Sequence, residues 1–297
     1  MTVTVLTVKF CGNIKLKKSA SHIWSGKKKE RAISSQDLRM RLDMNKRYQS
    51  RDFSAWLRKR LEIRGGETIL DVGCGTGAQA LFMLEDVGSL GSVVALDISK
   101  DSIEGLIDQA NGLGYYNLEA FQLDMGDLES KLSKDFANLR FTLAHSSYAI
   151  YYSPKRLQVL NAMQSKLTPD GRLAIFTPCE PHGMVEFVSK YHKIPQPVID
   201  SLKFGSEQLV SLFREAFWNV DIHYFQSELN VTSANDFITF YQATTYYDEN
   251  RKAVLFNSAN EIINNFGALN FRKNGILLIA NSIRAGILAS ASLLNLT

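Results

Sequence analysis

Apolar residues in the middle of the chain occur in two alternating patterns. The first is a short continuous run such as residues 67–72, which ends in glycines and is typical of a buried strand. The second has apolar positions three and four residues apart, as in residues 78–90, and is typical of a helix. Further strands are predicted at 92–97, 118–123, 139–144 and 172–177, and further helices at 102–113 and 154–167. Strands separated by helices predict a mostly parallel sheet covered on both faces, which is a doubly wound α/β fold.

The last third of the chain departs from this simple alternation. Its pattern predicts a helix at 206–218, a strand at 219–225, two helices at 234–246 and 251–266, and a final strand at 275–281. No linker rich in Pro, Gly or Ser separates two independent parts. We therefore predict one domain with a helical insertion near residues 232–267.

The composition is that of an ordinary globular protein, because 45% of the 297 residues are hydrophobic and 22% are charged. Three scattered cysteines are too few for a disulfide framework, which indicates a reducing compartment and predicts a cytoplasmic protein. The apolar stretch at 275–296 contains Arg284, and an arginine at a membrane centre costs about 2.5–3.5 kcal/mol. We therefore predict no association with a membrane.

The positive charge is concentrated at the amino-terminal end. Residues 1–60 contain 16 Lys and Arg against 4 Asp and Glu, whereas the rest of the chain contains 18 against 26. Such a segment could be a nucleic-acid-binding arm, but like-charge blocks are commonly solvated tails, and aromatic residues for base stacking are sparse here. We predict a basic, flexible tail over residues 1–32 and no nucleic-acid partner. Residues 33–65 are predicted to form helices that cover the ligand-binding site described below.

A glycine-rich segment, Asp71-Val72-Gly73-Cys74-Gly75-Thr76-Gly77, joins the first predicted strand to the following helix. Glycines there allow a tight turn and a close approach of a ligand to the backbone, and the helix start supplies free N–H groups. Gly73, Gly75 and Ala78 also satisfy the spacing of a dinucleotide-binding loop. However, the carboxylate of Asp71 beneath the loop would repel a pyrophosphate and attract a cationic ligand.

Acidic residues end three successive predicted strands. Asp71 ends the first, Asp97 ends the second twenty residues after Gly77, and Asp124 follows the third. The carboxyl ends of parallel strands meet at one edge of the sheet, where ligands of doubly wound folds bind. A carboxylate in the position of Asp97 is suited to accept hydrogen bonds from ribose hydroxyls.

With these features the chain resembles the class I S-adenosylmethionine-dependent methyltransferases, clearly over residues 67–176 and loosely beyond them. The resemblance implies a Rossmann-like, seven-stranded sheet over residues 66–297, with the insertion as a lid. It also implies that Asp71 and the glycines hold the methionine moiety of the cofactor, that Asp97 binds the ribose, and that Asp124 with Met125 contacts the adenine. The cofactor contacts so predicted are Tyr48, Asp71, Gly73, Cys74, Gly75, Gly77, Asp97, Ile98, Asp124, Met125 and Ser146.

Methyl transfer is an in-line displacement, so the protein mainly supplies alignment, exclusion of water and sometimes a base. The segment after the fourth strand lacks the Asp/Asn-Pro-Pro-Tyr/Phe motif with which similar enzymes hold an amide or an adenine amine. It also has His145 where metal-assisted members of the family have an acid, so we predict no metal. His182, just after the fifth strand, is the first candidate for a base, followed by His145 and Tyr148.

The acceptor side is expected to be aromatic, because Tyr148, Tyr151 and Tyr152 follow the fourth strand and Phe240 and Tyr241 lie on the insertion. These observations predict a metal-independent methyltransferase that uses S-adenosylmethionine and acts on an oxygen or amine of a small molecule. The alternatives are a nucleic-acid-binding methyltransferase or adaptor that uses the basic arm, and a cofactor-binding protein without catalysis.

Overall fold

The computed structural model describes residues 34–283, and its centre is a seven-stranded sheet with the order β3-β2-β1-β4-β5-β7-β6. The first five strands pair in parallel, and β7 lies antiparallel between β5 and β6. The prediction of a doubly wound, mostly parallel sheet of seven strands is therefore confirmed. The strands are β1 (Thr68–Val72), β2 (Ser92–Asp97), β3 (Leu118–Gln122), β4 (Phe141–Ser147), β5 (Leu167–Pro178), β6 (Phe217–Val231) and β7 (Leu269–Ile283).

Helices cover both faces of this sheet. Neighbouring residues of a strand point to opposite faces, so they pack against different helices. On β1, Leu70 packs in one apolar core with α5, α6 and α9, while Ile69 packs in another with α2, α3 and α4. The helices of these two layers are α2 (Phe53–Leu61), α3 (Ala78–Val87), α4 (Lys100–Gly112), α5 (Leu128–Asp135), α6 (Arg156–Ser165) and α9 (Leu209–Ala216).

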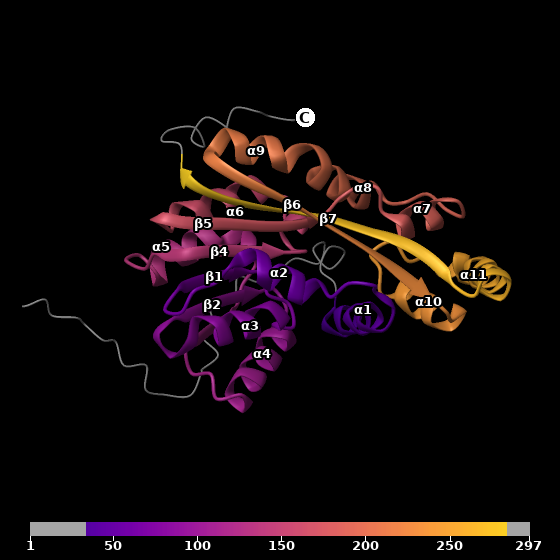
Figure 1. Cartoon of the computed structure of the whole chain (residues 1–297), viewed down its shortest axis with the longest axis horizontal. Coiled ribbons are helices and arrows are strands. Elements are labelled where there is room, and N and C mark those ends of the chain that lie inside the picture. Colours follow the sequence, from indigo (N-terminus) through magenta and orange to yellow (C-terminus); the bar gives the residue numbers. More distant parts are fainter. Residues whose placement is uncertain (1–33, 284–297) are drawn as a thin grey trace, which may run out of the picture.

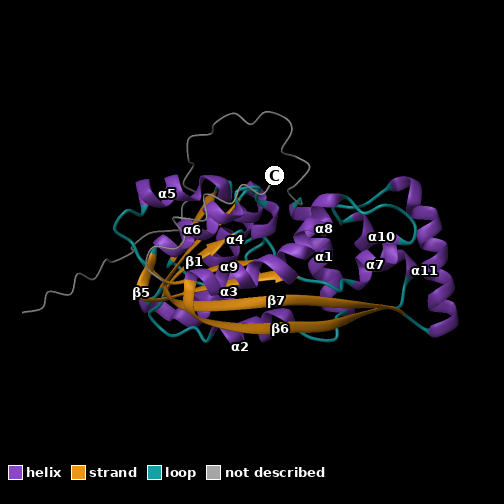
Figure 2. Ribbon diagram, turned by 90° about the horizontal axis from the view of Figure 1, so that it is seen from above, coloured by secondary structure: helices purple, strands orange, loops and turns teal. Residues whose placement is uncertain are grey.

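The strands β6 and β7 form a hairpin that extends well past the rest of the sheet and ends at two helices (Figures 1 and 2). A third apolar core packs around this extension. The helices in this part of the fold are α1 (Ser35–Tyr48), α7 (Gly183–Ser189), α8 (Gln196–Lys203), α10 (Ala234–Gln242) and α11 (Lys252–Phe266). The hairpin places α10 beside α1, next to the carboxyl edge of the sheet.

Both hairpin strands are longer than the sequence predicted. The outer half of β6 alternates strictly between buried and exposed residues from Phe225 to Val231, so it lacks the continuous apolar run of the inner strands. The predicted helix at 206–218 ends at Ala216, and its last two residues begin β6 with Trp218 exposed. The short helices α5, α7 and α8 were not predicted.

Two further expectations concern the amino-terminal tail and a membrane span. The predicted basic tail over residues 1–32 lies outside the described residues. Over residues 34–283, the helices are all too short or too polar to cross a membrane.

Candidate active site

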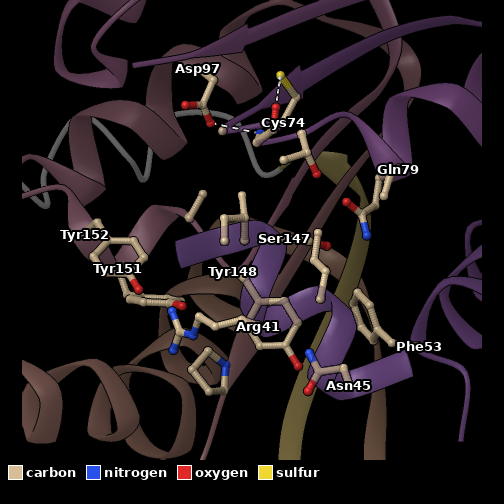
Figure 3. A pocket seen from close by; sticks show the side chains of 18 of the residues that line it. Arg41, Asn45, Phe53, Cys74, Gln79, Asp97, Ser147, Tyr148, Tyr151 and Tyr152 are labelled. Carbon is tan, nitrogen blue, oxygen red and sulfur yellow. Dashed lines mark hydrogen bonds between the residues drawn. The ribbon is translucent and has the colours of Figure 1, made fainter. Parts of the chain in front are cut away.

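A cavity of about 940 Å³ lies at the carboxyl edge of the sheet. Its wall is built from the loops after β1 to β5, from α1, and from the outer hairpin with α10. Ligand pockets in proteins commonly measure about 300–1,000 Å³, so this cavity lies at the large end of that range. Figure 3 shows Asp97 and Cys74 on one side of the space and Arg41 and Tyr148 on the opposite side.

The glycine loop forms the first side of the cavity. Gly73, Gly75 and Gly77 all have positive φ, which favours glycine because it has no Cβ. At Gly73 an added Cβ would lie 2.3 Å from the Cβ of Ala149, so the loop packs directly against the segment after β4. The backbone N–H groups of Gly73 and Cys74 both donate to the carbonyl of Leu96, at 2.7 and 3.0 Å. Gly73, Cys74 and Gly75 line the cavity, whereas Gly77 is buried against Leu106.

Asp97, at the end of β2, connects the loop to the next strand. Its Oδ2 accepts a hydrogen bond from the Gly75 N–H and its Oδ1 accepts one from the Ser99 N–H, both at 2.8 Å. Burial raises the pKa of this carboxyl, and the two backbone hydrogen bonds oppose that rise. Each oxygen keeps a second lone pair, so the carboxylate can accept further hydrogen bonds from hydroxyls of a ligand in the cavity.

Asp124, Met125 and Ile98 complete this side of the cavity. Asp124 follows β3 and begins a short helical turn, and its Oδ1 accepts a hydrogen bond from the Gly126 N–H at 2.9 Å. Ile98 is 38% exposed and Met125 half-buried, which gives the wall two apolar surfaces beside the two acids.

Asp71 is not part of the cavity wall, although the sequence predicted a direct contact with the cofactor. It is 1% exposed, and its Oδ1 lies 2.8 Å from Nδ1 of His145, which faces it across the β1–β4 pairing. Nε2 of His145 lies 2.8 Å from Oγ of Ser147, and Ser147 does line the cavity. Because a carboxylate only accepts, Nδ1 donates to Asp71, and in the tautomer with its hydrogen on Nδ1 alone the Nε2 atom accepts from the Ser147 hydroxyl. The negative charge of Asp71 is thus linked through His145 to a hydroxyl at the wall.

Three further predicted residues lie away from the wall. His145 is fully buried between its two partners, so no cavity ligand touches it. Ser146, next to it on β4, points its buried hydroxyl to the other side of the strand, where no described residue accepts it. Tyr48 donates to Asp236 and thereby fastens α1 to α10.

The opposite side of the cavity brings together Arg41 of α1, Tyr148, His182 and Lys273 of β7. Burial, followed by the charges of Lys273 and Arg41, lowers the pKa of His182 to about 4, so the imidazole is neutral at neutral pH. Its buried Nδ1 has no partner among the described residues. Tyr148 has φ of 54° and a buried hydroxyl that is also without a described partner, and burial raises the pKa of its phenol. His182 is therefore better suited than Tyr148 to accept a proton.

Lys273 and Arg41 were missed by the sequence reasoning. Burial and then the charge of Arg41 lower the pKa of Lys273 to about 7, and its Nζ lies 3.3 Å from Oε1 of Gln49 and 5.5 Å from the centre of the Tyr148 ring. Strand alternation was a signal that could have identified Lys273, because it lies two residues from each of the buried residues Phe271 and Gly275 and so shares their face of the strand. Arg41 had no such signal, since α1 carries several similar basic residues.

Aromatic residues close this side of the cavity. Tyr151, Tyr152, Phe240 and Tyr246 line it, together with Thr244. Tyr241, which the sequence placed at the acceptor, is instead fully buried in the third core, where its hydroxyl binds His192 and the Asp248 N–H. In the part of the chain from 34 to 283, no three His, Cys, Asp or Glu side chains gather as metal ligands.

Comparison with known proteins gives a consistent match. A family model described as a methyltransferase domain matches residues 63–224. Aklanonic acid methyltransferase of a Streptomyces species is 30% identical over 152 residues, which are 50% of this chain and 66% of the relative. Demethylmenaquinone methyltransferase of Oceanobacillus iheyensis is 27% identical over 161 residues, which are 53% of this chain and 65% of the relative. The chain thus spans slightly less than two thirds of the length of these relatives.

Two solved structures share the fold. A methyltransferase described as putative from Bacillus halodurans has a TM-score of 0.53 at 19% identity and covers 77% of this chain and 97% of its own. The YcgJ protein of Bacillus subtilis has a TM-score of 0.55 at 16% identity with the same coverage. At this level of identity the likeness extends to the fold alone.

Proposed function

The chain belongs to the class I S-adenosylmethionine-dependent methyltransferases through its methyltransferase domain, and on that premise we propose that it methylates an oxygen or amine of a small molecule. The observation that carries the proposal is the two-sided cavity. One side carries the loop and acids for a cofactor, and the other is lined by aromatic and basic side chains. S-adenosylmethionine supplies a methyl group activated by the positive sulfur.

The residues of the first side fit this cofactor. Asp97 has lone pairs left for the two ribose hydroxyls, and Met125 with Ile98 offers apolar surface to the adenine beside Asp124. The hydroxyl oxygen of Ser147 lines the cavity beside His145 and would accept a hydrogen bond from the cofactor ammonium. Asp71 lies behind the cavity wall and would strengthen this contact, since its negative charge attracts the ammonium and sulfonium cations through the intervening side chains of His145 and Ser147.

The residues of the second side perform the remaining tasks of the reaction. The rings of Tyr148, Phe240 and Tyr246 hold the acceptor and keep water from the methyl group. Neutral His182 takes the proton that an acceptor hydroxyl or ammonium loses. A carboxylate is not among the groups at the end of β4, where Ser147 and Tyr148 stand, so we propose that the reaction needs no metal.

A small acceptor is supported by the aromatic lining of this side and by the names of two relatives, which state aklanonic acid and demethylmenaquinone as acceptors. The direct test incubates the protein with methyl-deuterated S-adenosylmethionine and a fractionated cell extract, followed by mass spectrometry. The proposal predicts a labelled product in the small-molecule fraction that the Asp97→Asn variant forms much more slowly at a limiting cofactor concentration. Label found only in RNA, DNA or protein would contradict it.

A further inference from the structure

The acceptor side of the cavity contains a group of basic side chains that the reaction as described above does not require. Arg41 reaches the wall from α1, Lys273 from β7, and His182 from the segment after β5. All three line the same cavity, and Lys273 Nζ lies 5.5 Å from the centre of the Tyr148 ring in it. In agreement with this arrangement, the charge of Arg41 lowers the pKa of both Lys273 and His182. The guanidinium of Arg41 disfavours the charged form of Lys273, and an anion placed between the two groups would favour that form.

No carboxylate of the described chain serves as that anion. Within residues 34–283, the ion pairs involve other basic residues, and neither Arg41 nor Lys273 lies within reach of an acidic side chain. The acids of the cavity wall have other partners or positions. Asp97 accepts from two backbone N–H groups, Asp124 and Asp127 follow β3, and Asp52 caps α2 through the Ala55 N–H.

The order of the strands separates these cations from the cofactor. The proposed contacts for ribose, adenine and methionine follow β2, β3 and β1, and the sheet then continues through β4 and β5 to β7. His182 follows β5 and Lys273 lies on β7, so both stand on the far side of β4 from the ribose site. Figure 3 likewise shows Arg41 across the open space from Asp97.

We propose that the acceptor is an aromatic carboxylic acid, whose carboxylate pairs with Arg41 and Lys273. The planar guanidinium of Arg41 matches a carboxylate with two parallel hydrogen bonds, and the Lys273 ammonium adds a second charge. The aromatic body of the acid packs among Tyr148, Phe240 and Tyr246. This inference rests on the proposed function, because it names the class of molecule that enters the same cavity.

The inference is tested by calorimetry on the full chain saturated with S-adenosylhomocysteine, using three matched pairs of probes. These are benzoate and benzamide, phenylacetate and phenylacetamide, and cinnamate and cinnamamide. We expect the acid of at least one pair to bind about tenfold tighter than its amide, since charge-assisted hydrogen bonds are roughly twice as strong as neutral ones. We also expect net proton uptake near neutral pH, because the bound anion raises the lowered pKa of Lys273, which Arg41, His182, Tyr148 and Gln49 surround.

Two variants identify the groups responsible. Lys273→Gln and Arg41→Gln should each reduce the preference for the acid to about twofold or less, with little change in affinity for S-adenosylhomocysteine. Lys59→Gln is the matched control, because Lys59 is an exposed residue of α2 away from the cavity and loses the same charge.

Three results would overturn the inference. One is equal binding of all acids and amides to a protein that binds S-adenosylhomocysteine. Another is an acid preference that survives in both variants. The third is a loss of S-adenosylhomocysteine affinity in the variants as large as the loss of acid affinity, which would assign the cations to the carboxylate of the cofactor. Absence of S-adenosylhomocysteine binding in the unchanged chain would instead refute the proposed function itself, and this inference with it.

Discussion

Replacing Asp97 with Asn tests the cofactor site at the position where the structure gives the most detail. Each carboxylate oxygen accepts one backbone N–H at 2.8 Å, from Gly75 and from Ser99, and has one lone pair left for a ribose hydroxyl. The asparagine keeps one such oxygen and replaces the other with an NH2 group, which cannot accept. One ribose hydrogen bond and one backbone hydrogen bond are therefore lost.

The two losses appear in different measurements. A hydrogen bond to a charged group contributes about 1.5–3 kcal/mol, so S-adenosylhomocysteine should bind about 10–150-fold more weakly in calorimetry. The unpaired backbone N–H of Gly75 or Ser99 should lower the free energy of unfolding by about 1–3 kcal/mol in denaturant titration without ligand. Asp101→Asn is the matched control, because Asp101 is exposed in the first turn of α4 and away from the cavity. An unchanged affinity in a folded Asp97→Asn protein would refute the assignment of the ribose site.

Three further outcomes follow from the same geometry. Ser147→Ala should weaken S-adenosylhomocysteine binding about tenfold in calorimetry, because it removes the acceptor for the ammonium. An unchanged affinity would contradict the assignment of Ser147 to the ammonium. His182→Gln should lower kcat with KM nearly unchanged. In the unchanged protein, kcat should fall only as the pH drops toward about 4, where His182 gains its proton. A fall in kcat already near pH 7 would exclude His182 as the base. Gly73→Ala should abolish cofactor binding and lower Tm, since its Cβ would lie 2.3 Å from Ala149, and a cofactor affinity close to that of the unchanged protein would contradict the loop geometry.

The sequence predicted the part of the fold in which local pattern and tertiary environment agree. The parallel strands are buried on both faces and read as apolar runs, and β2 matches its predicted bounds at both ends. The family resemblance that was based on the glycine loop is confirmed by the matching family model. The outer hairpin was missed because only one side of it is buried, which gives alternation instead of a run.

The residues of the cavity also differed in how far the sequence alone could predict them. The glycines form a contiguous motif and Asp97 lies twenty residues after Gly77, so both could be found from spacing alone. The position of Asp71 behind the wall could not, because it depends on the pairing of β1 with β4, which brings His145 beside it. Arg41 and Lys273 are 232 positions apart in the chain, and only the fold of the hairpin onto α1 brings them together.

The central claim is that one cavity holds the cofactor on the glycine-loop side and the acceptor on the side of His182 and Lys273. A crystal structure of the protein with S-adenosylhomocysteine tests this claim most directly. We expect both ribose hydroxyls within hydrogen-bond distance of Asp97, the ammonium at Ser147, and the sulfur facing the space between Tyr148 and His182. A ligand whose ribose does not reach Asp97, or whose sulfur faces away from Tyr148 and His182, would contradict the account.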